Sequence, residues 1–205
     1  MWSQGDTVIE GNLNLLTPQE RDVVMHINLA RANPAGYARV YLEPRRGMFL
    51  QNVYFDPLDP RGHGLRTTEG EAAVAEAVQE MSQVAGMSAL TVSAALTKAA
   101  QEHAQDQAIS GQIGHQGRDF STPGTRITRH GTWESMIGEV IAYGPVTGRE
   151  VVSWLLIDDG VKSRGHRRNI LNSQFQLIGV AIMPHPGYGH LVVTDFADYV
   201  TESGQ

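Results

Sequence analysis

The chain has 205 residues, with 16 lysines and arginines against 22 aspartates and glutamates, a formal net charge of −6 and no cysteine. A chain of this length is expected to form one domain with a sizeable core. The acidic balance and the absence of a long basic run argue against nucleic acid as a partner. Without cysteine the chain has no disulfide, no thiolate nucleophile and no cysteine-ligated metal.

Targeting signals are not visible in the sequence. No apolar stretch approaches the roughly 18 residues that a membrane-spanning helix needs, so we expect no membrane span. The first eleven residues carry Asp6 and Glu10 and lack both a basic start and an apolar core, so no signal peptide is recognised. We therefore expect either a cytoplasmic protein or a mature form whose signal segment has been removed.

The first helix is predicted from its ends. Thr17 to Glu20 reads as a capping box with proline in the first turn, which predicts a helix over 18–32. Asn33-Pro34 ends it, because the residue before a proline is pushed away from helical backbone angles. A short turn is expected over 35–41.

Three further helices follow from composition and capping. Alanine-rich stretches predict helices over 69–85 and 94–110, the second ending at Gly111. A capping box from Thr147 to Glu150 predicts a helix that runs to about Asp158.

The remaining segments are predicted to be irregular or extended. Residues 43–68 and 111–131 are rich in glycine, proline and polar residues and are expected to be loops. A short strand is predicted over 139–143, and the apolar runs 177–183 and 191–196 predict a β-hairpin with a long, glycine-rich loop. Early helices and late antiparallel strands favour an α+β or layered α/β/α domain.

Histidines are the main polar resource of the sequence. His115 and His166 each follow a glycine in a segment without helical or strand period, so we expect both on loops that face a cleft. His103 lies on an apolar helix and is expected to be a core histidine with one satisfied nitrogen. His185 and His190 flank the predicted hairpin turn, where exposure to solvent is expected.

Three acidic residues stand out beside them. Glu139 begins an apolar strand, where a carboxylate needs a partner. Asp158 and Asp159 lie at a helix C-terminus, where the helix dipole disfavours negative charge, so each is expected either to be solvated or to have a partner such as Arg164, Arg167, a histidine or a metal. The two glycine-flanked histidines and these acids could form a divalent-metal site or an acid/base pair.

Seven segments together resemble, in order, the CAP superfamily of cysteine-rich secretory, antigen five and pathogenesis-related proteins, also called SCP-like domains. The segments are Ala99 to Asp106, Gly114-His115, Arg126 with Gly131, Gly138 to Gly144, Trp154, Gly165 to Leu171 and Ile178 to Ala181. The resemblance implies a three-layer α-β-α sandwich of the α+β class. It implies a domain over 17–200 with an insertion at 43–85, an N-terminal extension at 1–16 and a C-terminal tail at 201–205.

The resemblance also implies a central cleft with two histidines and two acids. His115, Glu139 and His166 match three of these positions, and Asp158 or Asp159 would take the fourth. His115 and His166 would then be the ligands of Zn²⁺ or another divalent cation. If the cleft were catalytic, His115, Glu139, Asp158 and His166 would be the candidates.

The function implied by the resemblance is that of a binding protein. It would be a cysteine-free, bacterial-type member, secreted or attached to the cell envelope, whose signal segment has been removed. Its cleft would bind a divalent metal, a small molecule or a lipid. The alternative is a metal-dependent peptidase or esterase that uses the same cleft. A covalent hydrolase is less favoured, because no serine shares a motif with either histidine.

The insertion has an expectation of its own. Residues 43–68 include Phe49, Tyr54 and Phe55 without a strand period, so we expect this segment to pack over the domain near the cleft or to offer a surface to a partner. The alternative is a loop that only caps the edge of the core.

Overall fold

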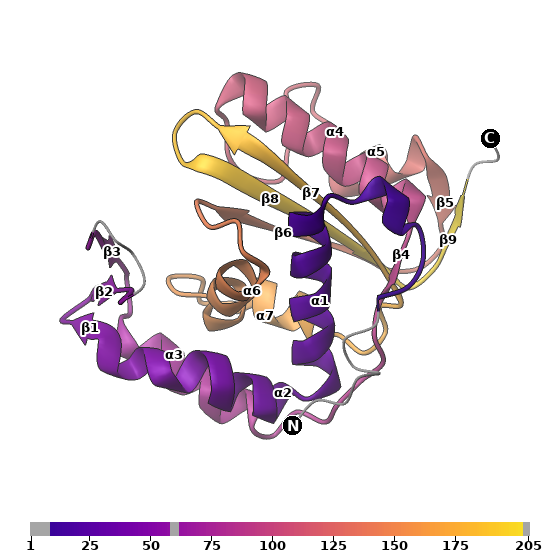
Figure 1. The fold of residues 1–205 in the computed structure, drawn as a ribbon. Helices are drawn as coiled ribbons and strands as arrows, with labels where there is room; N and C mark the ends of the chain where they lie inside the picture. The colour runs from indigo at the N-terminus through magenta and orange to yellow at the C-terminus, as the bar shows by residue number, and fades with distance from the viewer. Residues whose placement is uncertain (1–8, 58–61, 203–205) are drawn as a thin grey trace.

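The computed structural model describes residues 9–57 and 62–202. Its middle layer is a four-stranded mixed sheet of strand order β4-β7-β8-β6, with β6 at one edge (Figure 1). The long hairpin of β7 and β8 forms the centre, and β6 pairs antiparallel with β8. The strands are β4 (Thr91–Val92), β6 (Ile137–Tyr143), β7 (Leu177–His185) and β8 (Gly189–Ala197).

Helices cover both faces of this sheet (Figure 1). On one face lie α4 (Ala94–Ser110) and α5 (Pro123–Thr128), and on the other lie α1 (Pro18–Ala32), α6 (Gly148–Ile157) and α7 (Gly165–Ile170). Strand side chains alternate between the faces. Ile141 and Val193 pack under α4, whereas Val140 and Val192 belong to the core on the α1 and α6 side. The predicted α+β sandwich is confirmed.

The predicted first helix begins and ends where its capping signals lie. In α1 the Thr17 hydroxyl accepts a hydrogen bond from the Glu20 backbone at 3.3 Å, and the Glu20 carboxylate accepts one from the Thr17 backbone at 2.7 Å. The second oxygen of Glu20 accepts from the Ile182 N–H at 2.9 Å, which ties the start of α1 to β7. Helix α4 likewise ends at Gly111, in the left-handed conformation.

Several segments expected to be loops contain short elements instead. Residues 43–68 include a 3-10 helix and three strands, 111–131 includes α5 and the start of β5, and β7 and β8 leave only residues 186–188 between them. Elements this short show no measurable period, which is why the sequence did not reveal them. Their bounds are η4 (Glu43–Met48), β1 (Phe49–Leu50), β2 (Val53–Phe55), β3 (Gly64–Arg66) and β5 (Gly131–Trp133).

The remaining elements are short or lie near the ends. They are η2 (Leu13–Leu15), α2 (Pro34–Tyr37), η3 (Ala38–Leu42), α3 (Glu71–Met81) and β9 (Val200–Glu202). The described part of the N-terminal extension packs on β4, because the Asn12 N–H donates to the Val92 carbonyl at 3.0 Å. Thr201 and Glu202, placed in the C-terminal tail by the sequence, pair with β5 in an antiparallel ladder. Within the described residues, no helix has both the length and the apolar character needed to cross a membrane.

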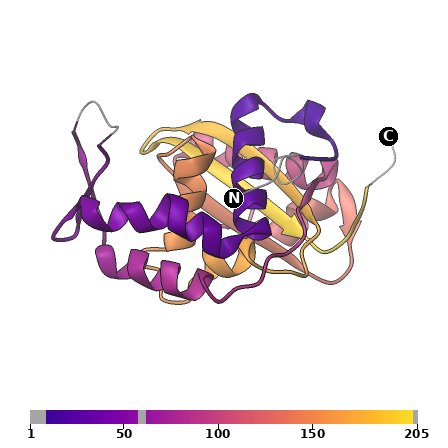
Figure 2. The ribbon, with the colours of Figure 1, turned by 60° about the horizontal axis from the view of Figure 1, so that its bottom comes forward.

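The insertion packs firmly against α6 and α7. Arg45 donates two hydrogen bonds to the Glu150 carboxylate, at 2.6 and 3.0 Å. The Tyr54 ring meets the Trp154 ring edge-on, with 5.0 Å between centroids. Figure 2 shows the small β1-β2-β3 sheet standing out from the helices, with α3 running beside the preceding helical segment. The expectation that this segment packs near the domain's cleft side is confirmed.

Acidic residues around α3 clamp two arginines of the α7 segment. Arg164 donates to both Glu69 and Glu76 at 2.6–2.8 Å, and Arg167 donates to Glu76 and Glu80. These hydrogen bonds from Arg164 lower the pKa of both Glu69 and Glu76 from 4.5 to about 2. The ionised carboxylates therefore hold the insertion against the start of α7.

Arg31 is fully buried, and its donors all go to backbone oxygens. Its guanidinium donates to four carbonyls, those of Ser88, Ile170, Asn172 and Phe175, at 2.7–3.0 Å. Burial lowers its pKa to about 10, so it still carries its charge at neutral pH. Arg31 thus joins α1 to the C-terminal end of α7.

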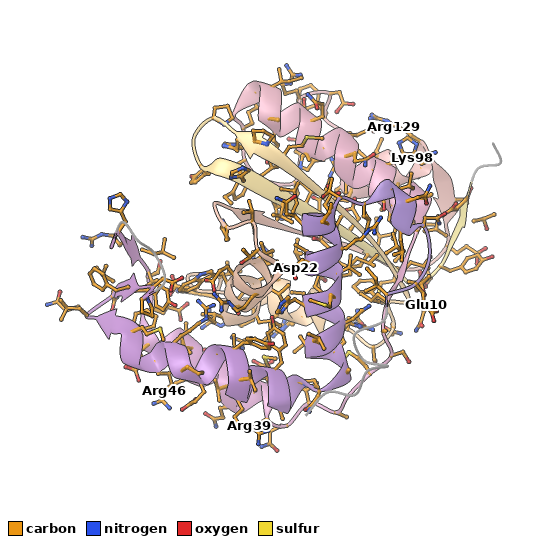
Figure 3. All side chains as sticks on the ribbon, in the orientation of Figure 1. Glu10, Asp22, Arg39, Arg46, Lys98 and Arg129 are labelled. Carbon is orange, nitrogen blue, oxygen red and sulfur yellow. The ribbon has the colours of Figure 1, made fainter. Side chains whose placement is uncertain are left out.

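We predict that Arg31→Met lowers the free energy of unfolding by at least about 3 kcal/mol, because it leaves several buried carbonyls without a donor. Urea unfolding measures this change. Arg39→Met is the matched control, since Arg39 lies exposed on the outer side of η3 (Figure 3) and its replacement should change stability by less than about 0.5 kcal/mol. A small effect at Arg31 would show that the carbonyls find other donors.

The clamp on α7 predicts a pH dependence. Because the folded pKa of Glu69 and Glu76 lies below the ordinary 4.5, their contribution to stability is present above pH 4.5 and is lost as the pH falls towards 2. The double variant Glu69→Gln/Glu76→Gln should be less stable than the wild type at pH 6, and the difference should vanish near pH 2. Urea unfolding at both pH values tests this, with Glu71→Gln, in an exposed pair with Arg46, as control. A difference independent of pH would contradict the assignment.

Candidate functional site

His115 is held by a buried carboxylate. It lies in the loop after α4, with its Nδ1 2.7 Å from Oε1 of Glu139. Arg126 donates to the other oxygen of Glu139 at 2.6 Å and to the His115 carbonyl at 3.2 Å. Burial would raise the pKa of Glu139, but the hydrogen bond to His115 and the charge of Arg126 lower it below its usual value. Glu139 is therefore an ionised partner for His115.

A second carboxyl group lies behind this pair. Asp195 on β8 is directly opposite Glu139 in the strand register and is fully buried. No N–H or hydroxyl group of the described residues donates to either of its carboxyl oxygens, and the carboxyl group lies within hydrogen-bonding reach of Glu139. Burial and the neighbouring charge of Glu139 raise the pKa of Asp195 well above its usual value. Sequence reasoning missed it, although a carboxylate inside the apolar run 191–196 was a signal.

His103 confirms the prediction made for it. It is buried on α4, and its Nε2 lies 2.8 Å from the Gly114 carbonyl. Its Nδ1 has no partner among the described residues, and burial lowers its pKa, so the ring is neutral. His103 therefore supports the backbone of the loop that carries His115.

His166 is held in the same way by a second carboxylate. Its Nδ1 lies 2.7 Å from Oδ1 of Asp158, and its backbone N–H donates to Oδ2 of the same residue at 2.9 Å. Asp158 has left-handed backbone angles (φ 58°) at the end of α6, which turn its side chain towards the start of α7. His166 was expected on a loop but lies in the first turn of α7, a helix too short to leave a periodic pattern.

The choice that the sequence left open between the two aspartates is settled by their partners. Asp158 is the carboxylate that binds His166. Asp159 instead accepts hydrogen bonds from the backbone N–H groups of Thr68 and Glu69, at 2.6 and 2.7 Å. Asp159 therefore anchors the insertion.

The two His–carboxylate pairs flank the edge strand β6. Glu139 points to the α4 face, as its neighbour Ile141 does, whereas α7 packs on the other side. Asn169 of α7 donates to the Glu139 carbonyl at 3.3 Å. A Cβ atom at Gly138 would lie 3.0 Å from Phe175 and 3.1 Å from Asn169, so the absence of a side chain there lets the α7 segment approach β6. The pairs thus come from different layers and are joined through the backbone of β6.

A cleft of about 960 Å³ opens beside the second pair. His166 and Asp158 line it, whereas His115 and Glu139 do not. Its walls come from the insertion, the end of β6, the α6–α7 segment and the tip of the β7–β8 hairpin. Other residues that line the cleft include Asp56, His63, Leu65, Arg66, Ile141, Glu150, Trp154, Leu155, Asp159, Val161, Tyr188 and His190.

The hairpin histidines differ from each other. His190 is exposed on the cleft wall, as expected. His185 was expected to be exposed, but only 3% of its surface is accessible. Its ring packs against Tyr143 and Tyr188, and its Nε2 lies 3.2 Å from the Gln112 carbonyl. The prediction was wrong because β7 and β8 continue to the hairpin tip, so His185 is part of the ladder.

The pairs leave one nitrogen of each imidazole available. Nδ1 is occupied in both His115 and His166, while Nε2 has no hydrogen-bond partner among the described residues. The side chain of His115 is 53% exposed and that of His166 is 26% exposed. No three histidine, aspartate or glutamate side chains in the described part of the chain gather closely enough to hold one metal ion. Over that part of the chain, the geometry therefore offers two oriented imidazoles and no preformed cage of protein ligands.

Comparison with known proteins gives relatives of limited extent. The uncharacterized protein YkwD of Bacillus subtilis (strain 168) is 33% identical over 111 residues, which are 54% of this chain and 41% of that protein. The chain thus spans less than half the length of this relative.

Two solved structures are similar in part. An outer surface protein from Borrelia burgdorferi is 22% identical, with a TM-score of 0.46 over 57% of this chain and 80% of that one. An extracellular protein with an SCP domain from Bacillus anthracis str. Ames is 21% identical, with a TM-score of 0.44 over 62% of this chain and 37% of that one.

The family assignment comes from a family model that matches residues 28–196. The matched range contains both His–carboxylate pairs and the edge strand between them. Since this range is well over half of the chain, the chain belongs to the CAP family, the cysteine-rich secretory protein family, although it has no cysteine of its own.

Proposed function

We propose that this CAP-domain protein is a binding module whose cleft takes a small ligand with an apolar part, and that the His166–Asp158 pair is its polar anchor. The observation that carries this proposal is the position of that pair in the wall of the 960 Å³ cleft. Such a volume is typical of small-molecule sites, which combine apolar walls with a few fixed polar groups. Leu65 and Val161 supply apolar side chains to the same wall.

A divalent cation such as Zn²⁺ is the second part of the proposal. A carboxylate on Nδ1 fixes the ring and directs Nε2 outward, which is the usual support of a metal-binding histidine. His166 and His115 would each supply Nε2. Because no third protein ligand is gathered near either one among the described residues, water or the bound ligand would complete the coordination. This predicts weak metal binding compared with a closed structural site.

A location outside the cytoplasm, either extracellular, periplasmic or at the cell envelope, belongs to the same proposal. The family's description as secretory supports it.

A metal-dependent peptidase or esterase is the alternative function. The feature that favours it is the Asp158-oriented imidazole of His166, which has the arrangement of a general base. No serine or threonine hydroxyl is hydrogen-bonded to His115 or His166 in the described residues, so hydrolysis would need an activated water. Turnover of peptide or ester substrates by the zinc-loaded protein, abolished by His166→Ala, would favour this alternative.

We predict that Leu65→Ser weakens binding of the neutral apolar dye N-phenyl-1-naphthylamine by about fivefold, the cost of losing partial burial of one leucine side chain. Fluorescence titration measures the affinity. Leu65 is 49% exposed, so the change should not unfold the chain. Leu50→Ser is the matched control, because Leu50 lies on the same small sheet, is 69% exposed and does not line the cleft. Equal losses in both variants would indicate that the dye binds elsewhere.

For the metal, we predict that zinc binds the wild type and that His166→Ala weakens it by at least about tenfold, because a direct ligand is lost. Isothermal titration calorimetry measures this, and His190→Ala, which removes an exposed histidine of the same cleft, serves as control. If His115→Ala has no effect while His166→Ala does, the two imidazoles do not share the ion. An unchanged affinity in both variants would refute the zinc proposal and leave the cleft as a site for an organic ligand.

A further inference from the structure

The edge strand β6 borders the cleft along its free side. It is the last strand of the central sheet and pairs with β8 on one side only. Ile141, Ala142 and Tyr143 follow one another in β6, and all three line the cleft. Their side chains alternate between the two faces of the sheet, and those of Ile141 and Ala142 are buried in the cores on opposite faces. What the three residues share on the cleft side is therefore their backbone edge.

The pairing with β8 decides which backbone groups point to that edge. The Gly144 N–H donates to the His190 carbonyl at 2.9 Å, so these two residues form a hydrogen-bonded pair of the ladder. Such pairs alternate along two antiparallel strands. In the register of β6 and β8, Ala142 therefore directs its N–H and C=O to β8, whereas Ile141 and Tyr143 direct theirs to the free edge. The described residues supply no hydrogen-bond partner for these four outward groups.

Helix α7 marks where the free part of this edge begins. The Asn169 side chain donates to the Glu139 carbonyl at 3.3 Å. Glu139 lies two residues before Ile141, so its occupied carbonyl belongs to the same outward set. Pro145, which has no N–H, follows on the other side of the free part. An open strand edge of this kind is a template for pairing with another strand.

From this pattern we infer that the cleft receives an extended peptide segment, which adds as a strand to the free edge of β6 and pairs with the backbone of Ile141 and Tyr143. The inference rests on the proposed function, and it names the class of ligand for the same cleft. Two N–H donors and two C=O acceptors that alternate along one line match the main chain of a second strand. In strand addition these main-chain bonds supply affinity, and the surrounding side chains supply specificity.

The walls around this edge favour a peptide with apolar side chains at alternate positions. One set of side chains of an added strand would lie on the α6 side, where Trp154 and Leu155 line the cleft. Leu65 is paired with Tyr54 in the small sheet, so both side chains lie on one face, and the Tyr54 ring contacts Trp154. Leu65 therefore adds apolar surface to the wall that this set of side chains would meet.

The test follows amide hydrogen exchange of the full chain by NMR, with a hexapeptide of alternating serine and valine, acetylated and amidated at its ends, as the probe. In the free protein, the amides of Ile141 and Tyr143 should exchange at least about tenfold faster than that of Ala142, which is bonded to β8. With saturating peptide, exchange at Ile141 and Tyr143 should slow by at least about tenfold, because both N–H groups gain an acceptor.

Gly64 and Arg66 are the matched control within the same chain. The Thr67 N–H donates to the Asn52 carbonyl at 2.8 Å, and the alternation from this pair places the backbone groups of Gly64 and Arg66 on the free edge of β3. Their amides should exchange at the same rate with and without the peptide.

Two N-methylated forms of the peptide test whether the main chain makes the contact. The N–H groups of successive strand residues point to opposite edges, so methyl groups on all serine nitrogens block one edge and methyl groups on all valine nitrogens block the other. One form should bind at least about tenfold more weakly than the unmethylated peptide, and the other should bind as well as it does.

The outcomes separate this inference from the proposed function. Protection of Ile141 and Tyr143, together with weaker binding of one methylated form only, supports strand addition. A peptide that leaves both amides unprotected, that protects Gly64 and Arg66 instead, or whose two methylated forms bind equally overturns it. In that case, dye binding that still depends on Leu65 keeps the proposed function. Absence of dye binding alongside peptide addition to β6 would contradict only the proposed site for a small apolar ligand.

Discussion

The buried guanidinium of Arg31 is the interaction on which the site depends most. Helix α7 has six residues, too few to be stable alone, since helix formation needs several turns to offset its nucleation cost. Arg31 satisfies carbonyls at and beyond its C-terminal end, where the helix dipole also favours a positive charge. Asp158 binds the N–H groups of its first turn. With both ends fixed, α7 holds His166 towards the cleft and Asn169 against β6.

Buried charge is used elsewhere in the fold to fix polar side chains. Glu139 lies between a histidine and an arginine, and the pKa of Asp195 opposite it is raised because burial and the charge of Glu139 disfavour a second ionised carboxylate there. Removing one member of such a network would leave the others buried without a partner, which costs free energy. The fully paired arrangement is therefore strongly favoured, and it fixes the position of each side chain. The same principle applies on the other side of β6, where Asp158 is buried and His166 is partly exposed. Each imidazole thus has one fixed nitrogen and one nitrogen that no described residue occupies.

The insertion converts the neighbourhood of His166 into a walled cleft. Without β2 and β3, the α6–α7 segment would present Trp154 and His166 on an open surface. Ion pairs made by Arg45, Arg164 and Arg167 attach the insertion to α6 and to the α7 segment. The His166–Asp158 pair lies on these same two helices. The shape of the cleft and the pair that lines it therefore depend on the same contacts. This coupling links the stability of the fold to the geometry of the proposed binding site.

The sequence by itself determined the long helices and the central hairpin, because capping boxes and apolar periodicity are local signals. It also indicated that Glu139 and the two aspartates need partners, because a charge beside an apolar run or at a helix C-terminus is a local signal too. The resemblance then identified the family and named His115, Glu139, His166 and one of two aspartates as candidate site residues. Only the tertiary structure decided that Asp158 rather than Asp159 meets His166, since that choice depends on a left-handed turn and on a backbone 90 residues away. It also decided the burial of Asp195 and His185 and the wall supplied by the insertion. Those features arise from strand register and from contacts between residues far apart in the sequence. Neither produces a local pattern that can be recognised in the sequence alone.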